Sequence, residues 1–301
     1  MQASRAAQEP QTGQADLRLG RRVFAPHEPI VMAIVNRTPD SFFDQGATFA
    51  EDAALRAVDA AVAAGADIVD IGGVKAGPGA EVDVAEELRR TVSTVAAVRQ
   101  RHPDVIISID TWRAEVATEA VAAGADLLND TWAGTDPRLA EVAAATGAGL
   151  VCSHAGGLTP RTRPHRVGFE DIVGDVIGTV TALADKALAA GVRRDGILID
   201  PAHDFGKNTR HSLELTRRLD AMVATGWPVL VALSNKDFVG ETLDVPVGER
   251  LSGTLAATAV SAWLGARVFR AHQVRETRQV LDMVAAIRGE RPPAVARRGL
   301  A

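Results

Sequence analysis

The sequence contains one cysteine, Cys152, among 301 residues. A single cysteine excludes a disulfide bond within the chain and is typical of proteins that work in a reducing compartment. The N-terminal segment also lacks the apolar core of a secretory signal peptide. Both absences lead us to expect a cytoplasmic protein.

Long apolar runs and an excess of positive charge are missing as well. No stretch approaches the roughly 20 apolar residues that a membrane-spanning helix requires, so we expect no membrane contact. The formal net charge is −5, whereas proteins that bind nucleic acid nonspecifically are usually basic. Motifs of cysteine and histidine that hold zinc are absent from the sequence. A small molecule is therefore the expected partner.

A near-repeat runs through the chain, in which hydrophobic residues make up 47%. Five copies of the repeat occur along the chain. They are AAGADIVDIGG from Ala63, AAGADLLNDT from Ala122, ATGAGLVCSH from Ala145, AAGVRRDGILID from Ala189 and LGARVFRAH from Leu264. Each copy is typical of the end of an alanine-rich helix, a capping glycine and a short apolar strand. Because the apolar runs are continuous, they indicate strands buried on both faces of a parallel sheet.

Eight such strands are predicted, at residues 30–35, 68–71, 105–109, 127–128, 150–152, 197–199, 229–233 and 268–270. Helical patterns lie between them, for example at residues 51–64, 84–101, 114–123, 172–190 and 250–264. Eight strand–helix pairs predict an α/β protein with the TIM (β/α)8 barrel fold as a single domain. A doubly wound open sheet, the alternative, more often has about five or six strands.

The two ends of the chain depart from this rhythm. Residues 1–22 have no periodic apolar face, and we expect them to be disordered. Residues 289–301 contain consecutive prolines and several arginines, and we expect an extended surface tail. The barrel is then predicted to span residues 23–288. Within it, the small apolar stripe at 253–264 suits helix packing between two subunits, which predicts a homodimer.

Polar residues follow nearly every predicted strand. In (β/α)8 barrels the working residues lie at the C-terminal ends of the strands, which here collects Asn36, Asp70, Asp110, Asn129, Asp200, Ser234, Lys236, Arg270 and His272. A single Asp or Asn after a strand is often only a helix cap or turn former. Long cations are not capping residues, and a barrel rim would not hold them unpaired. The set as a whole therefore predicts a binding site.

The residue types in this set indicate a flat, nitrogen-rich ligand. Carboxylates such as Asp110 and Asp200 accept two parallel hydrogen bonds from an amidine-like edge, and the amide of Asn129 suits the same kind of ring. Lys236 is placed to donate to ring acceptors. These four positions predict a site for a planar heterocycle that offers N–H donors.

Three further residues come from the first and last predicted strands, which are neighbours in a closed barrel. Arg270, His272 and Asn36 together predict a corner that binds an anion. A magnesium ion held partly by Asn36 and partly by phosphate oxygens is compatible with this corner.

The motifs themselves resemble those of dihydropteroate synthase, a transferase of folate biosynthesis. They are NRTPDSFFD, ISIDTWRAEVA, LLND, IDPAHDFGK, SNKDFVG and FRAH, in this order. The resemblance extends over about residues 30–287 and is closest to the divergent second homologue that actinobacteria carry beside their working enzyme. In the family, magnesium diphosphate leaves a pterin and p-aminobenzoate takes its place.

The resemblance implies a role for each matching residue. The pterin would be gripped by Asp110, Asn129, Asp200 and Lys236, with Phe205 packed beside the ring. The diphosphate and its magnesium would face Asn36, Arg270 and His272, and p-aminobenzoate would lie near Ser234. The expected catalytic groups are Lys236, Arg270 and His272.

The loop after the second strand departs from the family pattern. Where the family has Glu-Ser-Thr-Arg-Pro, this chain has Val74, Lys75, Ala76, Gly77 and Pro78. The hydroxyl and guanidinium that help to close the loop on diphosphate and p-aminobenzoate are therefore missing. Loss of one desolvated charged contact typically costs about 2–5 kcal/mol.

Other departures lie near the same subsites. Arg37 replaces a valine and is expected to add bulk and charge at the mouth, and Asn235 replaces an arginine. His203 and Asp204 occupy a turn that is glycine-rich in the family. We therefore expect a retained pterin pocket, open to sulfa or sulfone inhibitors, with synthase activity weak or lost. The alternatives are a competent dihydropteroate synthase, and a methyltransferase-like or non-enzymatic protein that binds pterin or folate.

Overall fold

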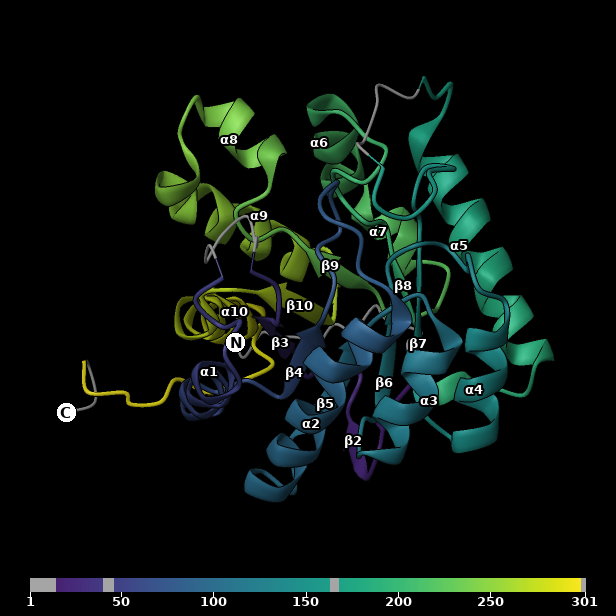
Figure 1. Ribbon diagram of the computed structural model, residues 1–301. Coiled ribbons are helices and arrows are strands. Elements are labelled where there is room, and N and C mark those ends of the chain that lie inside the picture. The colour runs from purple at the N-terminus through teal and green to yellow at the C-terminus, as the bar shows by residue number, and fades with distance from the viewer. Residues whose placement is uncertain (1–14, 40–45, 163–167, 299–301) are drawn as a thin grey trace.

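The computed structural model describes residues 15–39, 46–162 and 168–298. Eight parallel strands form a sheet in the order β8-β7-β6-β5-β4-β3-β10-β9, and helices surround it (Figure 1). A parallel bridge between Ile199 and Val229 brings β8 beside β9. The strands are β3 (Ile30–Asn36), β4 (Ile68–Gly72), β5 (Ile106–Asp110), β6 (Leu127–Asp130), β7 (Gly149–Ser153), β8 (Ile197–Asp200), β9 (Leu230–Ala232) and β10 (Val268–Ala271). The predicted single-domain TIM barrel is confirmed.

The helices are α1 (Glu51–Ala63), α2 (Val84–Arg101), α3 (Ala114–Ala122), α4 (Arg138–Thr146), α5 (Ile172–Ala189), α6 (Thr209–Arg217), α7 (Leu219–Val223), α8 (Asp237–Leu243), α9 (Leu251–Trp263) and α10 (Val274–Arg288). The sequence Ala-Gly-Ala follows two of them. Gly65 after α1 has φ 97° and Gly124 after α3 has φ 119°, a region that residues with a side chain rarely adopt. The next residues then enter β4 and β6.

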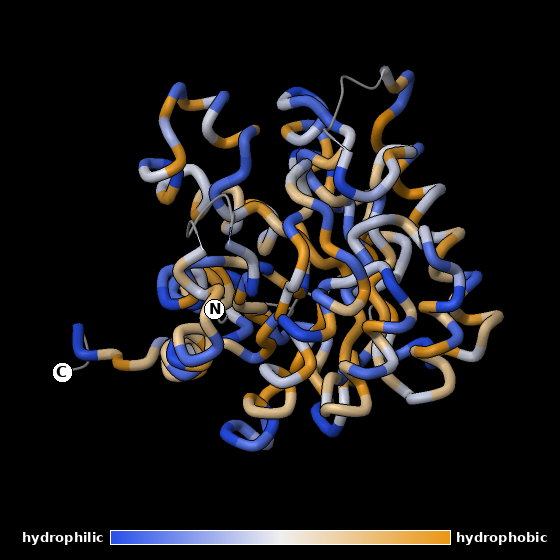
Figure 2. Tube along the Cα trace, viewed as in Figure 1, coloured by the Kyte–Doolittle hydropathy of each residue, from blue (hydrophilic) through white to orange (hydrophobic). Residues whose placement is uncertain are grey.

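The core has two layers because successive side chains of a strand point to opposite faces. On β4, Ile68 belongs to the cluster inside the barrel, and Val69 belongs to the cluster between strands and helices. Figure 2 shows the apolar residues concentrated along the strands and the inner sides of the helices. The same alternation decides which strand-end residues face the barrel interior.

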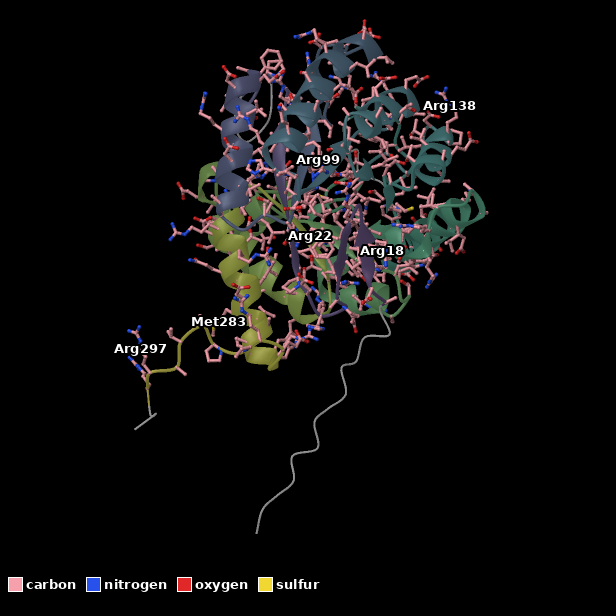
Figure 3. All side chains as sticks on the ribbon, turned by 90° about the horizontal axis from the view of Figure 1, so that it is seen from below. Arg18, Arg22, Arg99, Arg138, Met283 and Arg297 are labelled. Carbon is pink, nitrogen blue, oxygen red and sulfur yellow. The ribbon has the colours of Figure 1, made fainter. Side chains whose placement is uncertain are left out.

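A short antiparallel hairpin closes the N-terminal end of the barrel. It consists of β1 (Leu17–Leu19) and β2 (Arg22–Phe24), and Figure 3 shows it from below with Arg18 and Arg22 labelled. Leu17, Leu19 and Phe24 are fully buried in the inner cluster. The expectation that residues 1–22 are disordered is therefore wrong for 17–22, where alternating leucines supply an apolar face. Residues 1–14 lie outside the described residues.

The C-terminal tail follows α10. Gly289 ends that helix with φ 78°, and residues 291–298 are exposed without helix or strand. Figure 3 places Arg297 on this tail, away from the barrel. Across 15–39, 46–162 and 168–298, no helix is both long and apolar enough to span a membrane.

Candidate functional site

The polar residues gather at the C-terminal end of the barrel because of strand alternation. Inward positions are apolar deep in the barrel and become polar toward the strand ends, as Ile68 is followed by Asp70 and Leu127 by Asn129. The inward polar set consists of Asn36, Asp70, Ser108, Asp110, Asn129, Ser153, Asp200, Ser234, Arg270 and His272. The residues that the sequence assigned to the site are thus brought together at one mouth.

Asp70 forms the centre of the hydrogen-bond network on the floor of this mouth. Its carboxylate accepts from Arg270 Nε at 2.6 Å, from Ser108 Oγ at 2.5 Å and from Asn129 Nδ2 at 3.1 Å. Its exposed fraction is 0%. Sequence reasoning placed Asp70 at a strand end but gave it no role, although its inward parity two residues after Ile68 was a usable signal.

Asp110 lies one step nearer the opening and is paired with the same arginine. Arg270 Nη2 donates to Asp110 Oδ2 at 2.8 Å, and Thr131 Oγ1 donates to Oδ1 at 3.4 Å. Burial raises the pKa of Asp110, Arg270 opposes this shift, and the negative charge of Asp70 adds to it. Arg270 therefore serves the two carboxylates here, whereas the sequence assigned it to an anion.

Asp200 and Lys236 lie at the ends of β8 and β9. Asp200 Oδ1 accepts from the backbone N–H of Ala202 at 2.7 Å, and burial raises the pKa of this carboxyl. Lys236 Nζ donates to the carbonyl of His203 at 2.6 Å and lies 4.6 Å from the centre of the Phe205 ring. Burial lowers the pKa of Lys236. The side chains of Asp200 and Lys236 are therefore both hydrogen-bonded to the backbone of the turn after β8.

Ser234 connects the ends of β9 and β10. Its hydroxyl donates to Gln273 Oε1 at 3.1 Å and lies 3.0 Å from His272 Nδ1. Asn235, which replaces the family's arginine, is 1% exposed and turns its amide toward Ser234 and Gln273. Its φ of 57° is in the left-handed region, which asparagine tolerates better than most residues.

A cavity of about 100 Å³ opens at this mouth. It is lined by Ile34, Asn36, Thr38, Val74, Lys75, Ala76, Asp110, Phe205, Ala232, Ser234, Lys236, Arg270 and His272. Asn129 and Asp200 are buried more deeply, with exposed fractions of 1% and 3%. The loop after β4 therefore contributes Val74, Lys75 and Ala76 to the wall, where the family pattern has a glutamate, a serine and a threonine.

Arg37 lies elsewhere than expected. Its exposed fraction is 5%, and its Nε donates to the carbonyl of Arg90 in α2 at 3.0 Å. The expectation that it adds bulk and charge at the mouth is wrong, because Asn36 faces inward and the next residue therefore faces outward. Of the NRTPDSFFD motif, residues 40–45 lie outside the described residues.

The turn after β8 adopts unusual backbone angles. Ala202 has φ 48° and Asp204 has φ 69°, values that glycine accepts more easily than other residues. His203 between them is fully buried, stacks on Phe238 and has its Nε2 3.1 Å from Thr216 Oγ1. Asp204 accepts from Ser212 Oγ and from the backbone of Phe238. Non-glycine residues thus fit this turn by packing and hydrogen bonds.

Lys207 is hydrogen-bonded to the backbone of the same turn. Its Nζ donates to the carbonyls of His154, Ala202 and Phe205 at 3.0, 3.1 and 2.8 Å. Burial lowers the pKa of Lys207 to about 7. The lysine thereby joins the ends of β7 and β8 and fixes the backbone that carries Phe205.

Comparisons with known proteins agree with this geometry. The family model for a pterin binding enzyme matches residues 32–272. A protein of Mycobacterium leprae named inactive dihydropteroate synthase 2 is 60% identical over 286 residues, which cover 94% of this chain and 98% of that protein. The dihydropteroate synthase of Haemophilus influenzae is 37% identical over 256 residues, 85% of this chain and 92% of that one.

Solved structures give the same result. One is the crystal structure of Yersinia pestis dihydropteroate synthase in complex with a sulfonamide drug, which matches with a TM-score of 0.86 and 35% sequence identity. The match covers 92% of this chain and 100% of that one. The fold and the matching family model define a pterin-binding (β/α)8 barrel. The chain belongs to the dihydropteroate synthase family.

Proposed function

We propose that this protein binds a pterin at the mouth of its barrel and condenses a pterin diphosphate with p-aminobenzoate slowly or not at all. The observation that carries the proposal is a contrast within one cavity. The deep polar residues match the family pattern, whereas the loop wall formed by Val74, Lys75 and Ala76 does not.

The deep part of the site suits the N–H-rich edge of a pterin. Asp110 and Asp200 supply carboxylate acceptors, and Asn129 Oδ1 is a buried acceptor to which no described group donates. A buried polar atom without a partner costs about 1–3 kcal/mol, and a ligand N–H would remove that cost. Lys236 and Phe205 also line the cavity and supply a donor and an aromatic ring.

The diphosphate side supports weak turnover. Departure of diphosphate requires positive charge that is available to the leaving group. Arg270 is already paired with two carboxyl groups, Asp70 and Asp110, and the family's loop arginine is replaced by Gly77. At about 2–5 kcal/mol for a lost charged contact, the rate falls by roughly 30-fold to several thousand-fold.

A competent synthase is the second candidate, and one observation favours it. Lys75 lines the cavity and brings a cation to the wall from which the loop arginine is lost. On that alternative, a Lys75→Ala variant loses turnover that the wild type displays at an ordinary rate.

Magnesium enters the proposal only together with the diphosphate. Among the described residues, no group of three His, Cys, Asp or Glu side chains is placed to hold a metal, and Asn36 offers a single amide oxygen at the cavity wall. Mg²⁺ commonly takes few protein ligands and completes its shell with water and phosphate oxygens. Asn36 would hold the ion, which would neutralise charge on the leaving diphosphate.

Sulfonamide and sulfone compounds are further expected ligands, because the Yersinia pestis relative was solved with a sulfonamide drug. We also propose a cytoplasmic homodimer. Three apolar side chains on the α8–α9 face are exposed, Leu243 at 49%, Val260 at 47% and Trp263 at 56%. Leu243 and Val260 line a groove of about 390 Å³ between α6, α8 and α9, a surface that a second copy would cover.

The test joins calorimetry with a steady-state assay. We expect 6-hydroxymethylpterin to bind the wild type, Asp200→Ala to abolish that binding and Asp195→Ala, at the opposite end of β8, to leave it unchanged. We expect turnover of pterin diphosphate and p-aminobenzoate far below about 1 s⁻¹. Ordinary turnover would refute the loss of synthase activity, and unchanged affinity in Asp200→Ala would refute the pocket.

A further inference from the structure

Asn129 is held by one hydrogen bond whose chemistry fixes its orientation. Its Nδ2 donates to Asp70 Oδ2 at 3.1 Å, and the same Oδ2 accepts from Arg270 Nε at 2.6 Å. A guanidinium can only donate hydrogen bonds, so Asp70 Oδ2 acts as an acceptor here and suits a donor from the amide that faces it. The end of the Asn129 amide that faces Asp70 must therefore be the NH₂ group.

The other end of the amide is then an oxygen with a defined task. Asn129 Oδ1 is buried and receives no hydrogen bond from any described group. Asn129 is the register partner of Asp110, which lines the cavity. The oxygen therefore belongs to the polar floor beside Asp110 and requires a donor.

A second inward atom on the next strand is in the same condition. Ser153 has an exposed fraction of 0%, and its Oγ has no hydrogen-bond partner among the described residues. Val151, two residues earlier, faces the barrel interior, so Ser153 faces it too. Two unsatisfied polar atoms on the neighbouring strands β6 and β7 indicate that the ligand reaches this part of the floor.

We infer that Asp70 is a positioning residue that determines the hydrogen-bond polarity of the site. It turns Asn129 so that an acceptor faces the ligand, and it holds Arg270 in place through the same carboxylate. The site consequently selects a ring that presents an N–H donor to β6 and rejects one that presents a lone pair there. This inference rests on the proposed pterin binding and adds a specificity determinant that does not contact the ligand.

Two variants test the inference, with 6-hydroxymethylpterin as the calorimetric probe. Asp70→Asn provides an NH₂ group of its own, so Asn129 is no longer forced to present its oxygen, and we expect affinity to fall by about 10-fold to 100-fold. In the exchange variant Asp70→Asn/Asn129→Asp, the amide introduced on β4 donates to the carboxylate introduced on β6, whose second oxygen again faces the ligand. We expect this variant to regain affinity to within about 3-fold of the wild type.

The matched control is Asp126→Asn. Asp126 directly precedes β6 at the opposite end of the barrel and is also paired with an arginine, Arg99. Its side chain is 18% exposed, so its replacement tests for a general effect of removing a partly buried, arginine-paired carboxylate. We expect this control to retain the wild-type affinity. The urea midpoint of every variant is measured alongside, so that unfolded protein is recognised.

The outcomes separate the two proposals. A wild type that fails to bind the pterin refutes the proposed function and, with it, this inference. An Asp70→Asn variant that binds as tightly as the wild type overturns the positioning role alone. An exchange variant that is folded but binds as weakly as Asp70→Asn also overturns it, because Asp70 would then act through packing or charge instead of the orientation of Asn129.

Discussion

Arg270 donates to Asp110 at 2.8 Å, so the residue expected to face an anion and the residue expected to grip a heterocycle form one ion pair. A ligand that donates to Asp110 must share this carboxylate with the guanidinium. The ionised carboxylate has two oxygens with several lone-pair positions and can accept from both partners, whereas protonation turns one of these positions into a donor and weakens the shared arrangement.

The first prediction concerns pH. Burial raises the pKa of Asp110 to about 7, so the proton is retained at low pH and lost as the pH rises through that value. Pterin affinity should therefore increase between about pH 5.5 and about pH 8. In Asp110→Asn, which stays neutral, calorimetry over the same range should give lower affinity with less pH dependence. An unchanged slope in this variant would contradict the assignment.

The second prediction concerns the loop after β4. Replacing Val74→Glu, Lys75→Ser, Ala76→Thr and Gly77→Arg together restores the family's residues beside the cavity. We expect synthase turnover to rise by at least about 10-fold, since one recovered charged contact contributes about 2–5 kcal/mol. Pterin affinity, measured separately, should stay within about 3-fold because the deep residues are unchanged. A folded variant without increased turnover would show that the loop is not the cause.

The third prediction concerns Lys207. Lys207→Met removes the donor to three carbonyls at the ends of β7 and β8. The free energy of unfolding in urea should fall by about 1–3 kcal/mol, the cost of leaving a buried polar group unsatisfied. Lys186→Met in the last turn of α5 is the control and should change stability by less than about 0.5 kcal/mol. Equal effects of both variants would argue against a stabilising role for the three hydrogen bonds of Lys207.

The fourth prediction uses two positions with similar backbone angles and different contacts. Ala202→Gly relieves φ 48° without removing a side-chain hydrogen bond, so it should stabilise the protein by up to about 1 kcal/mol. Asp204→Gly relieves φ 69° but removes the acceptor for Ser212 and Phe238, so it should destabilise the protein. Thermal unfolding compares the two, and the same sign for both would contradict the account.

The fifth prediction concerns the α8–α9 face. Val260→Asp places a charge on the proposed subunit interface and should convert a dimer to a monomer in sedimentation experiments. Met283→Asp is the control on α10, because Met283 is also apolar and 60% exposed (Figure 3). A monomeric wild type would exclude the dimer.

The fold was predictable because its signal is local. The glycine-containing repeats mark helix ends and strand starts within about ten residues, and the strand-end rule then gathers Asp110, Asn129 and Asp200 at one mouth. The hairpin was missed because β1 and β2 have three residues each, which is too short for a periodic pattern to stand out.

The partners within the site were not predictable from the sequence. Asp70 and Arg270 are 200 residues apart, and which carboxylate an arginine selects depends on the closed barrel. The same reason explains Arg37, whose direction follows from the register of β3. The contacts of Lys207 were not predictable either, because the backbone carbonyls that satisfy this buried lysine carry no sequence signal.

The hairpin of β1 and β2 has a practical consequence for experiments on this protein. Since Leu17, Leu19 and Phe24 fill the barrel axis from one end, a small molecule has to arrive and depart through the opposite end. The hairpin lies on the plugged side, so a surface attachment made on this side of the barrel leaves the ligand's route open. Immobilised protein should therefore give the same affinities as protein free in solution.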